Sequence, residues 1–124
     1  MRELDVVFGS GLLGRAVARE LLAHKRRVPI VSRSGNGALV GAENHAADAT
    51  DPKAVAKACE GARVVFHTAT PDYTRWAELY PPIQRGILEG CASAGVKLVS
   101  AESVYMYGPG DRGMTESSPH VATT

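Results

Sequence analysis

The feature that most constrains this chain is a glycine-rich turn directly after its first apolar run. Residues 6–8 read as the end of a short strand, and Gly9, Gly11 and Gly14 fit the pattern G-x-G-x-x-G. The first glycine lets the chain turn sharply off the strand, the second lets the backbone approach a pyrophosphate, and the third lets a helix pack closely on the strand. The N–H groups of that helix would point at the phosphates. The motif therefore predicts a dinucleotide site, whose candidate contacts are Gly9, Ser10, Gly11, Leu12, Leu13 and Gly14.

The rest of the chain alternates between strand and helix patterns. The expected strands cover residues 4–8, 28–31, 43–47, 63–67 and 96–100, and the expected helices cover 12–24, 52–60 and 83–94. Apolar strands joined by helices predict a parallel sheet with right-handed crossovers. We therefore expect an α/β protein with a three-layer α/β/α Rossmann fold and the strand order 3-2-1-4-5. In such a sheet the ligand crevice lies where the order reverses, above the first and fourth strands.

Prolines and capping residues set the expected helix ends. Asp51 suits the N-cap position and Pro52 suits the first helical position, so we expect a helix to begin there and to stop at Gly61. Pro81 and Pro82 lack the backbone N–H that a helix interior needs. We therefore expect them to interrupt the helical region that follows residue 72, with a second helix beginning at residue 83.

The composition excludes several classes of protein. The chain has 124 residues, enough for one domain, and its formal net charge of +1 gives no general attraction to nucleic acid or to a membrane surface. No apolar run is long enough to span a bilayer, and the first residues carry no signal-peptide pattern. Cys59 and Cys91 show neither a metal-ligand nor a C-x-x-C spacing. We expect two free thiols in a cytoplasmic protein that acts on a small molecule and binds neither nucleic acid nor a membrane.

The end of the sequence suggests a division into two parts. We assign residues 1–108 to the dinucleotide-binding domain and residues 109–124 to a loop that leads into a C-terminal region absent from this sequence. No helix is expected after residues 96–100, which leaves a sheet edge and an apolar face uncovered. We therefore interpret the sequence as the N-terminal part of a longer protein. The alternative is a compact five-stranded domain that covers its edge by forming a homodimer.

Four stretches, taken together, resemble the extended or atypical short-chain dehydrogenase/reductases, the NAD-dependent epimerase/dehydratase group. They are residues 9–14, 48–51, 65–69 and 95–100 with the following 105–109. The resemblance implies that the acidic residue after the third strand, Asp48, contacts the adenine, with Ala49 beside it. It also implies that the backbone after the fourth strand lines the ribose and phosphate, through Thr68, Ala69 and Thr70. Ser100, at the end of the fifth strand, is a further candidate contact. The alternatives are a helix-start aspartate and an ordinary turn.

The end of the second strand bears on the choice between NAD and NADP. NAD sites place an Asp or Glu about 20 residues past the glycine turn, on the ribose 2′-hydroxyl. This chain has Ser32, Arg33 and Ser34 there instead. An arginine pairs bidentately with a 2′-phosphate, and serine hydroxyls add donors. We therefore predict NADP as the cofactor in preference to NAD, with a solvated loop arginine as the alternative reading.

The catalytic residues implied by the resemblance are only partly present. In the family a tyrosine of a Tyr-x-x-x-Lys pair transfers a proton, and a Ser or Thr after the fifth strand orients the substrate. None of the four tyrosines has a lysine four residues later, so the pair either follows Thr124 or has been replaced. Counting back from Tyr107 gives Ser103 as the substrate-orienting hydroxyl, whereas counting forward from Ser100 gives Glu102. We prefer Ser103, with a plain turn serine as the alternative. Where many relatives keep an asparagine, the helix before the fifth strand reads Pro-Ile-Gln, ending at Gln84.

Other candidate side chains have two readings each. Trp76, with Tyr73 and Tyr80 nearby, either lines an apolar substrate pocket or packs a helix on the sheet. His67 and His120 have the side chain of a general base, but the first ends a buried strand and the second lies in a terminal loop. We expect both histidines to be structural or exposed.

Three functions are compatible with these observations. The first is an NADP-dependent oxidoreductase or epimerase/dehydratase of which this chain supplies the cofactor-binding part. The second is a non-catalytic NADP-binding sensor or regulatory module. The third is a degenerate Rossmann scaffold without nucleotide binding.

Overall fold

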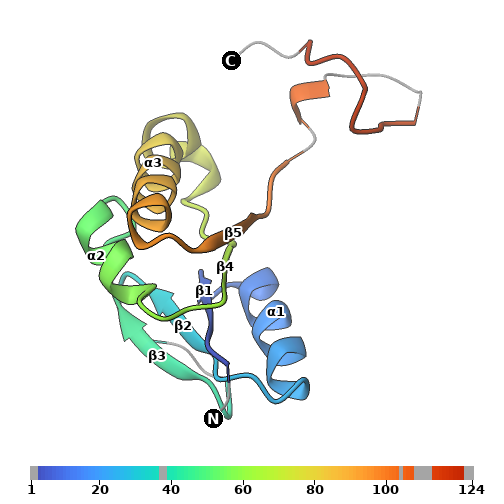
Figure 1. Ribbon diagram of the computed structural model, residues 1–124. Helices are drawn as coiled ribbons and strands as arrows, with labels where there is room; N and C mark the ends of the chain where they lie inside the picture. Colours follow the sequence, from blue (N-terminus) through green and yellow to red (C-terminus); the bar gives the residue numbers. More distant parts are fainter. Residues whose placement is uncertain (1–2, 37–38, 104, 108–112, 122–124) are drawn as a thin grey trace.

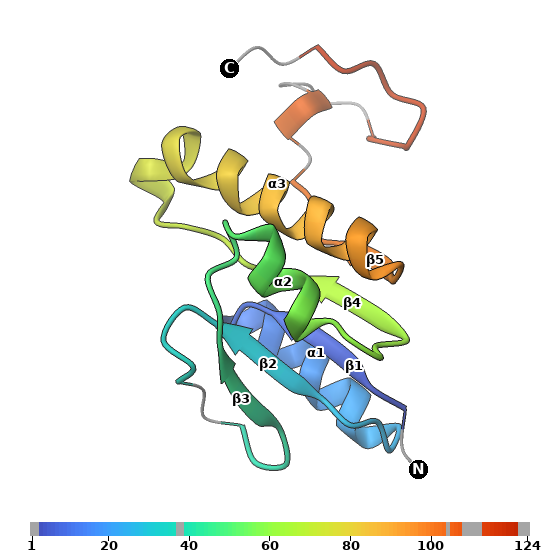
Figure 2. The same ribbon diagram turned by 60° about the vertical axis from the view of Figure 1, so that its left-hand side comes forward.

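The strands form one parallel sheet in the order β3-β2-β1-β4-β5 (Figures 1 and 2). The computed structural model describes residues 3–36, 39–103, 105–107 and 113–121. The predicted strand order and Rossmann fold are confirmed. The strands are β1 (Asp5–Phe8), β2 (Pro29–Ser32), β3 (Glu43–Ala46), β4 (Val64–His67) and β5 (Lys97–Ser100). The helices are α1 (Leu12–Ala23), α2 (Pro52–Ala58) and α3 (Trp76–Ala94), with 3-10 turns η1 (Tyr73–Arg75) and η2 (Tyr105–Tyr107).

Helices cover both faces of the sheet, α1 on one side and α2 with α3 on the other (Figure 2). Successive side chains of a strand point to opposite faces, so β1 serves both layers. Val6 and Phe8 pack with Val55 of α2 and Ile87 of α3. Val7 packs instead with the layer that contains α1. All four β1 side chains are buried, as expected for the central strand of a parallel sheet.

Local sequence sets the start of α2 as predicted. Asp51 is the N-cap residue, and its carboxylate accepts a hydrogen bond from the Lys53 backbone N–H at 3.1 Å. Pro52 occupies the first turn, where a missing N–H costs nothing. Gly61 follows with a φ of 76°, a left-handed conformation that glycine adopts without strain.

The prediction that Pro81 and Pro82 interrupt a helix was wrong. Helix α3 runs without a break from Trp76 to Ala94 and contains both prolines. Each proline removes one i→i−4 bond, so the carbonyls of Ala77 and Glu78 lose their helical donors. Both of those residues are exposed, so water can bind the freed carbonyls. The cost of the two prolines is therefore smaller than it would be in a buried turn.

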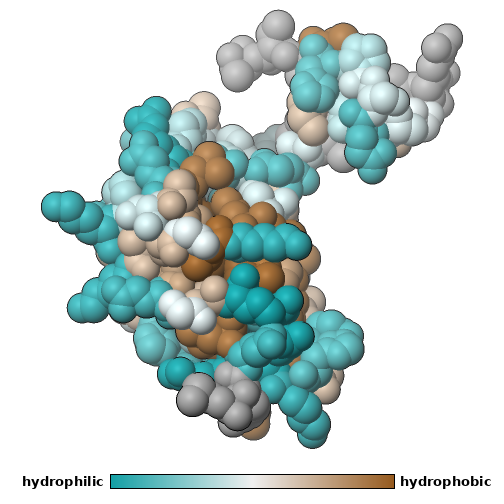
Figure 3. All heavy atoms as spheres, viewed as in Figure 1, coloured by the Kyte–Doolittle hydropathy of each residue, from teal (hydrophilic) through white to brown (hydrophobic). Residues whose placement is uncertain are grey.

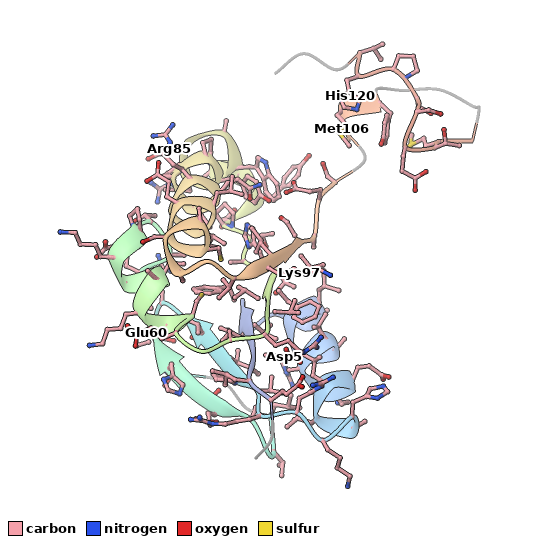
Figure 4. The ribbon with its side chains drawn as sticks, in the orientation of Figure 1. Asp5, Glu60, Arg85, Lys97, Met106 and His120 are labelled. Atoms are coloured by element: carbon pink, nitrogen blue, oxygen red, sulfur yellow. The ribbon has the colours of Figure 1, made fainter. Side chains whose placement is uncertain are left out.

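An ion-pair cluster closes the amino end of the sheet, far from the carboxyl ends of the strands. Asp5 is fully buried, and its Oδ2 accepts a hydrogen bond from Arg63 at 2.8 Å and lies 3.6 Å from Arg26 Nε (Figure 4). Glu3 pairs with both arginines. This arrangement ties β1 to the segments that precede β2 and β4.

The edge strand β5 keeps apolar surface in contact with solvent. Val99 is 44% exposed and Leu13 of α1 is 54% exposed. Figure 3 shows hydrophobic atoms gathered in the middle of the face that lies between α1 and α3. The expected uncovered apolar face is therefore present in the described part of the chain. None of the helices described is long and apolar enough to cross a membrane.

Candidate functional site

A groove of about 620 Å³ opens at the carboxyl ends of the strands, where the strand order reverses. Five segments line it: the turn after β1, the end of β2, the segment after β3, the turn after β4, and the start of α3. The predicted residues in its lining are Gly9, Ser10, Gly11, Ser32, Arg33, Ser34, Asp48, Ala49, Thr68, Ala69 and Thr70. The structure therefore brings together candidates as far apart in the sequence as Gly9 and Thr70.

The three glycines of the turn have the predicted geometry. Gly9 has a φ of 109°, and a Cβ atom there would lie 2.5 Å from Thr68 Oγ1. A Cβ atom at Gly14 would lie 2.0 Å from the Gly9 carbonyl oxygen, so this glycine permits the close packing of α1 on the turn. A Cβ atom at Gly11 would meet nothing within 4 Å. The space in front of Gly11 is therefore open to the groove, where a pyrophosphate would lie.

The amino end of α1 faces this space. Gly11 is the N-cap residue, no side chain caps the helix, and the first turn carries no acidic residue. The first N–H groups of a helix have no intrahelical partner. They can therefore bind an anion in the groove, and no carboxylate of the first turn competes for them.

The loop after β2 presents one cation and two hydroxyls. Ser32 Oγ accepts a hydrogen bond from the Gly35 N–H, and Ser34 Oγ accepts one from the Asn36 N–H, each at 3.1 Å. A hydroxyl that accepts keeps its own proton for donation. Arg33, between these serines in the sequence, is exposed and lines the groove. These groups form a donor set that fits a phosphate monoester.

Asp48 stabilises the turn before α2 and also lines the groove. Its Oδ1 accepts hydrogen bonds from the Thr50 N–H at 2.9 Å and the Thr50 hydroxyl at 2.6 Å, and these bonds shape the turn before α2. The same residue lines the groove. The hydrogen bonds from Thr50 lower the pKa of Asp48, and the nearby charge of Arg33 lowers it further. The carboxylate is therefore ionised at neutral pH.

Some predicted contacts lie away from the groove lining. The Leu12 and Leu13 side chains are 88% and 54% exposed, so only their backbone N–H groups, at the start of α1, are suited to a phosphate. Gly14 packs against the Gly9 carbonyl and does not line the groove. The Ser100 hydroxyl donates to Glu102 at 2.7 Å instead of facing the groove. Ser103 is exposed and follows β5, also outside the groove lining.

The segment from η1 into the first turns of α3 contributes groove residues that the sequence reasoning missed. They are Asp72, the N-cap residue of η1, Arg75 of η1, and Leu79 and Ile83 of α3. Asp72 Oδ1 accepts from the Thr74 N–H at 2.9 Å and from the Thr74 hydroxyl at 2.7 Å. The same Asp-x-Thr pattern occurs at residues 48–50, so this repeat was a usable signal.

The structure places both histidines where the sequence predicts, His67 at the buried end of β4 and His120 in an exposed terminal segment. His67 is 1% exposed, and burial lowers its pKa. His120 is exposed and packs edge-on against the Tyr107 ring, with centroids 5.5 Å apart.

The predicted loop from residue 108 lies partly outside the described residues. Within them, no group of His, Cys, Asp or Glu side chains could hold a metal ion.

Comparison with known proteins identifies the family. Residues 6–124 match the family model for the NAD dependent epimerase/dehydratase family. This chain belongs to that family. A search of curated proteins found no match.

Solved structures of this epimerase/dehydratase type share the fold. A UDP-galactose 4-epimerase has 27% identity and a TM-score of 0.76, over 95% of this chain and 44% of that one. A short-chain dehydrogenase/reductase superfamily protein from Agrobacterium tumefaciens with bound NAD has 26% identity and a TM-score of 0.80, over 98% of this chain and 40% of that one. A UDP-glucose-4-epimerase from Stenotrophomonas maltophila with bound NAD has 21% identity and a TM-score of 0.80, over 100% of this chain and 44% of that one. The chain thus spans less than half the length of these structures.

Proposed function

We propose that this chain is the cofactor-binding part of an NADP-dependent oxidoreductase or epimerase/dehydratase of the short-chain dehydrogenase/reductase type. The observation that carries the proposal is the single groove that joins the glycine turn to the β2 loop. Because Gly11 and Arg33 line the same groove, a dinucleotide with its pyrophosphate at Gly11 would have Arg33 available to its adenosine. When bound, the nicotinamide cofactor accepts or donates a hydride.

The donor set favours a 2′-phosphate over a free 2′-hydroxyl. Arg33 supplies a full positive charge, and Ser32 and Ser34 each keep a hydroxyl proton to donate. No Asp or Glu stands at the end of β2 to accept from a ribose hydroxyl. Two of the solved relatives are described with NAD, so the preference for NADP is a property we propose for this chain.

The preference for NADP can be tested by reversing the charge at Arg33, directly after β2. Arg33→Asp should weaken NADPH binding about a hundredfold and NADH binding far less, because a charge-assisted bidentate contact turns into a repulsion. Arg85→Asp makes the same change of charge on α3, where the side chain points away from the sheet (Figure 4). Calorimetric titration of both variants decides the matter: an equal loss for NADPH and NADH in Arg33→Asp would remove Arg33 from the 2′-phosphate role.

The alternative is a sensor or regulatory module that binds NADP without turnover. It uses the same groove, and none of the tyrosines in these 124 residues begins a Tyr-x-x-x-Lys pair. The gene sequence beyond the codon for Thr124 separates the two proposals. A tyrosine and lysine at the family spacing there would support the enzyme, and a lysine without its tyrosine would support the sensor.

A further inference from the structure

Three polar side chains connect the ends of β4 and β5 to α3. His67 Nε2 lies 2.8 Å from Gln84 Oε1, and Gln84 Nε2 lies 2.8 Å from Glu102 Oε1. Ser100 donates to the same Glu102 oxygen at 2.7 Å. We call His67, Gln84 and Glu102 the polar bridge. None of these three residues lines the groove.

The polar bridge fixes the tautomer of His67. The Ala69 backbone N–H donates to His67 Nδ1 at 3.2 Å, so Nδ1 carries no proton. The ring proton is therefore on Nε2 and is donated to Gln84 Oε1. This leaves the Gln84 amide nitrogen as the donor to Glu102, a carboxylate that only accepts. Each hydrogen bond of the polar bridge then joins one donor to one acceptor.

Packing keeps the His67 ring neutral and in place. The ring is 1% exposed and stacks on Tyr80, with centroids 6.1 Å apart and an interplanar angle of 18°. Tyr80 in turn stacks on Trp76 at 4.3 Å. The titratable groups that face His67 are Glu102 from the end of β5 and Tyr80 from α3. A doubly protonated ring would lose the acceptor that holds the Ala69 N–H.

The turn at residues 68–70, which His67 holds, packs against the glycine turn of the groove. Thr68 donates from its hydroxyl to the Phe8 carbonyl at 2.7 Å. The Ala69 backbone nitrogen would lie 2.9 Å from a Cβ atom at Gly9. Thr68, Ala69 and Thr70 all line the groove. A change in the hydrogen bond of the Ala69 amide is therefore transmitted directly to the cofactor-binding surface.

We propose that Gln84 is a positioning residue for the groove: its side-chain carbonyl holds His67 as the Nε2-protonated tautomer, whose Nδ1 fixes the Ala69 amide and the turn at residues 68–70. The part of this inference that concerns cofactor affinity rests on the proposed function. The part that concerns the ring and the amide does not.

The first experiment removes the carbonyl of Gln84. In the 124-residue chain, ring ¹⁵N shifts of His67 should show Nε2 protonated and Nδ1 bare at pH 8. Gln84→Met should abolish that preference, move the Ala69 amide resonance, and raise the Kd for NADPH about fivefold, as expected for one weakened hydrogen bond. Arg85→Met, on the exposed side of the same helix, is the matched control and should change none of these readouts.

The second experiment restores the polar bridge with its charges exchanged. The double variant Gln84→Glu/Glu102→Gln provides an acceptor for His67 Nε2 and a donor–acceptor pair between positions 84 and 102. It should recover the tautomer and the NADPH affinity at pH 8. It also places a carboxylate against the ring, which raises the pKa of His67, so affinity should fall on acidification toward pH 6 more steeply than in the wild type. If Gln84→Met lost affinity only through a general loss of structure, the double variant would not recover the tautomer and the NADPH affinity.

Two results would overturn the inference. One is a Gln84→Met variant that keeps the wild-type ring shifts and Kd. The other is a variant that binds more weakly while its ring shifts and Ala69 amide stay as in the wild type. If the wild-type chain binds no NADPH, the proposed function fails, and the ring and amide resonances alone decide the role of Gln84.

Discussion

Thr68 Oγ1 lies where a side chain at Gly9 would have to go, 2.5 Å from the position of its Cβ atom. The same hydroxyl donates to the carbonyl of Phe8, so it cannot swing away without losing a hydrogen bond. The turns after β1 and β4 are therefore fitted to one another through a glycine and a threonine. Both residues line the groove, so this contact shapes part of its wall.

Replacing Gly9 should lower the free energy of unfolding by more than backbone strain alone would. Gly9→Ala would combine a φ of 109° with the contact against Thr68, whereas Gly61→Ala carries a φ of 76° with nothing within 4 Å of its Cβ. We expect Gly61→Ala to lower the free energy of unfolding by about 1 kcal/mol. Gly9→Ala should lower it by about 3 kcal/mol, since two effects add. Urea unfolding measures both, and equal losses would show that the fit between the two turns contributes nothing.

Two glycines of α3 should separate stability from binding. A Cβ atom at Gly86 would lie 2.0 Å from the Ala49 carbonyl oxygen, in a segment that lines the groove. A Cβ atom at Gly90 would lie 2.5 Å from the Val55 side chain, outside the groove lining. Both alanine variants should lower the melting temperature, because overpacking costs roughly 1–3 kcal/mol. Only Gly86→Ala should also weaken NADPH binding. A loss of affinity in Gly90→Ala of the same size would contradict this division.

His67 should make stability depend on pH. Burial holds its pKa below the ordinary value of 6.5, so the unfolded chain binds the proton more readily than the folded one. The free energy of unfolding should therefore be greatest above pH 6.5 and fall as the pH is lowered from there through the folded pKa. His67→Gln should remove much of that slope, and His120→Gln, which changes an exposed ring, should keep it. Denaturant titrations at several pH values between 5 and 8 check this, and a slope retained in His67→Gln would assign it to other groups.

Pro81 offers a test of why α3 is continuous. Pro81→Ala would restore an N–H donor to the exposed Ala77 carbonyl. We expect a gain of about 1 kcal/mol in the free energy of unfolding, less than the ~3 kcal/mol typical of a proline in a helix interior, because the exposed carbonyl is accessible to water. Chemical denaturation measures the gain. A loss of stability would instead show that the proline itself is favourable at this position.

The sequence predicted most of the sheet because its signals are local. The apolar runs, the glycine turn and the Asp51-Pro52 start of α2 each depend on neighbouring residues, and strand order followed from short connections. The continuity of α3 was missed because it depends on the exposure of Ala77 and Glu78, which is set by tertiary packing. Arg75 was missed as a groove residue for a similar reason, since only the folded chain brings η1 into the same groove as the β2 loop. The polar bridge joins residues 67, 84 and 102, a spacing that no sequence motif encodes.

The most direct test of the central claim is calorimetric titration of the purified chain with NADPH and, separately, with NADH, with quenching of Trp76 fluorescence as a second signal. The Gly11→Val variant is the control, because its side chain would fill the open space at the glycine turn while its φ of −78° suits valine. We expect saturable binding that favours NADPH in the wild type and none in Gly11→Val. Absence of binding in the wild type, or equal binding in the variant, would contradict the assignment of the groove.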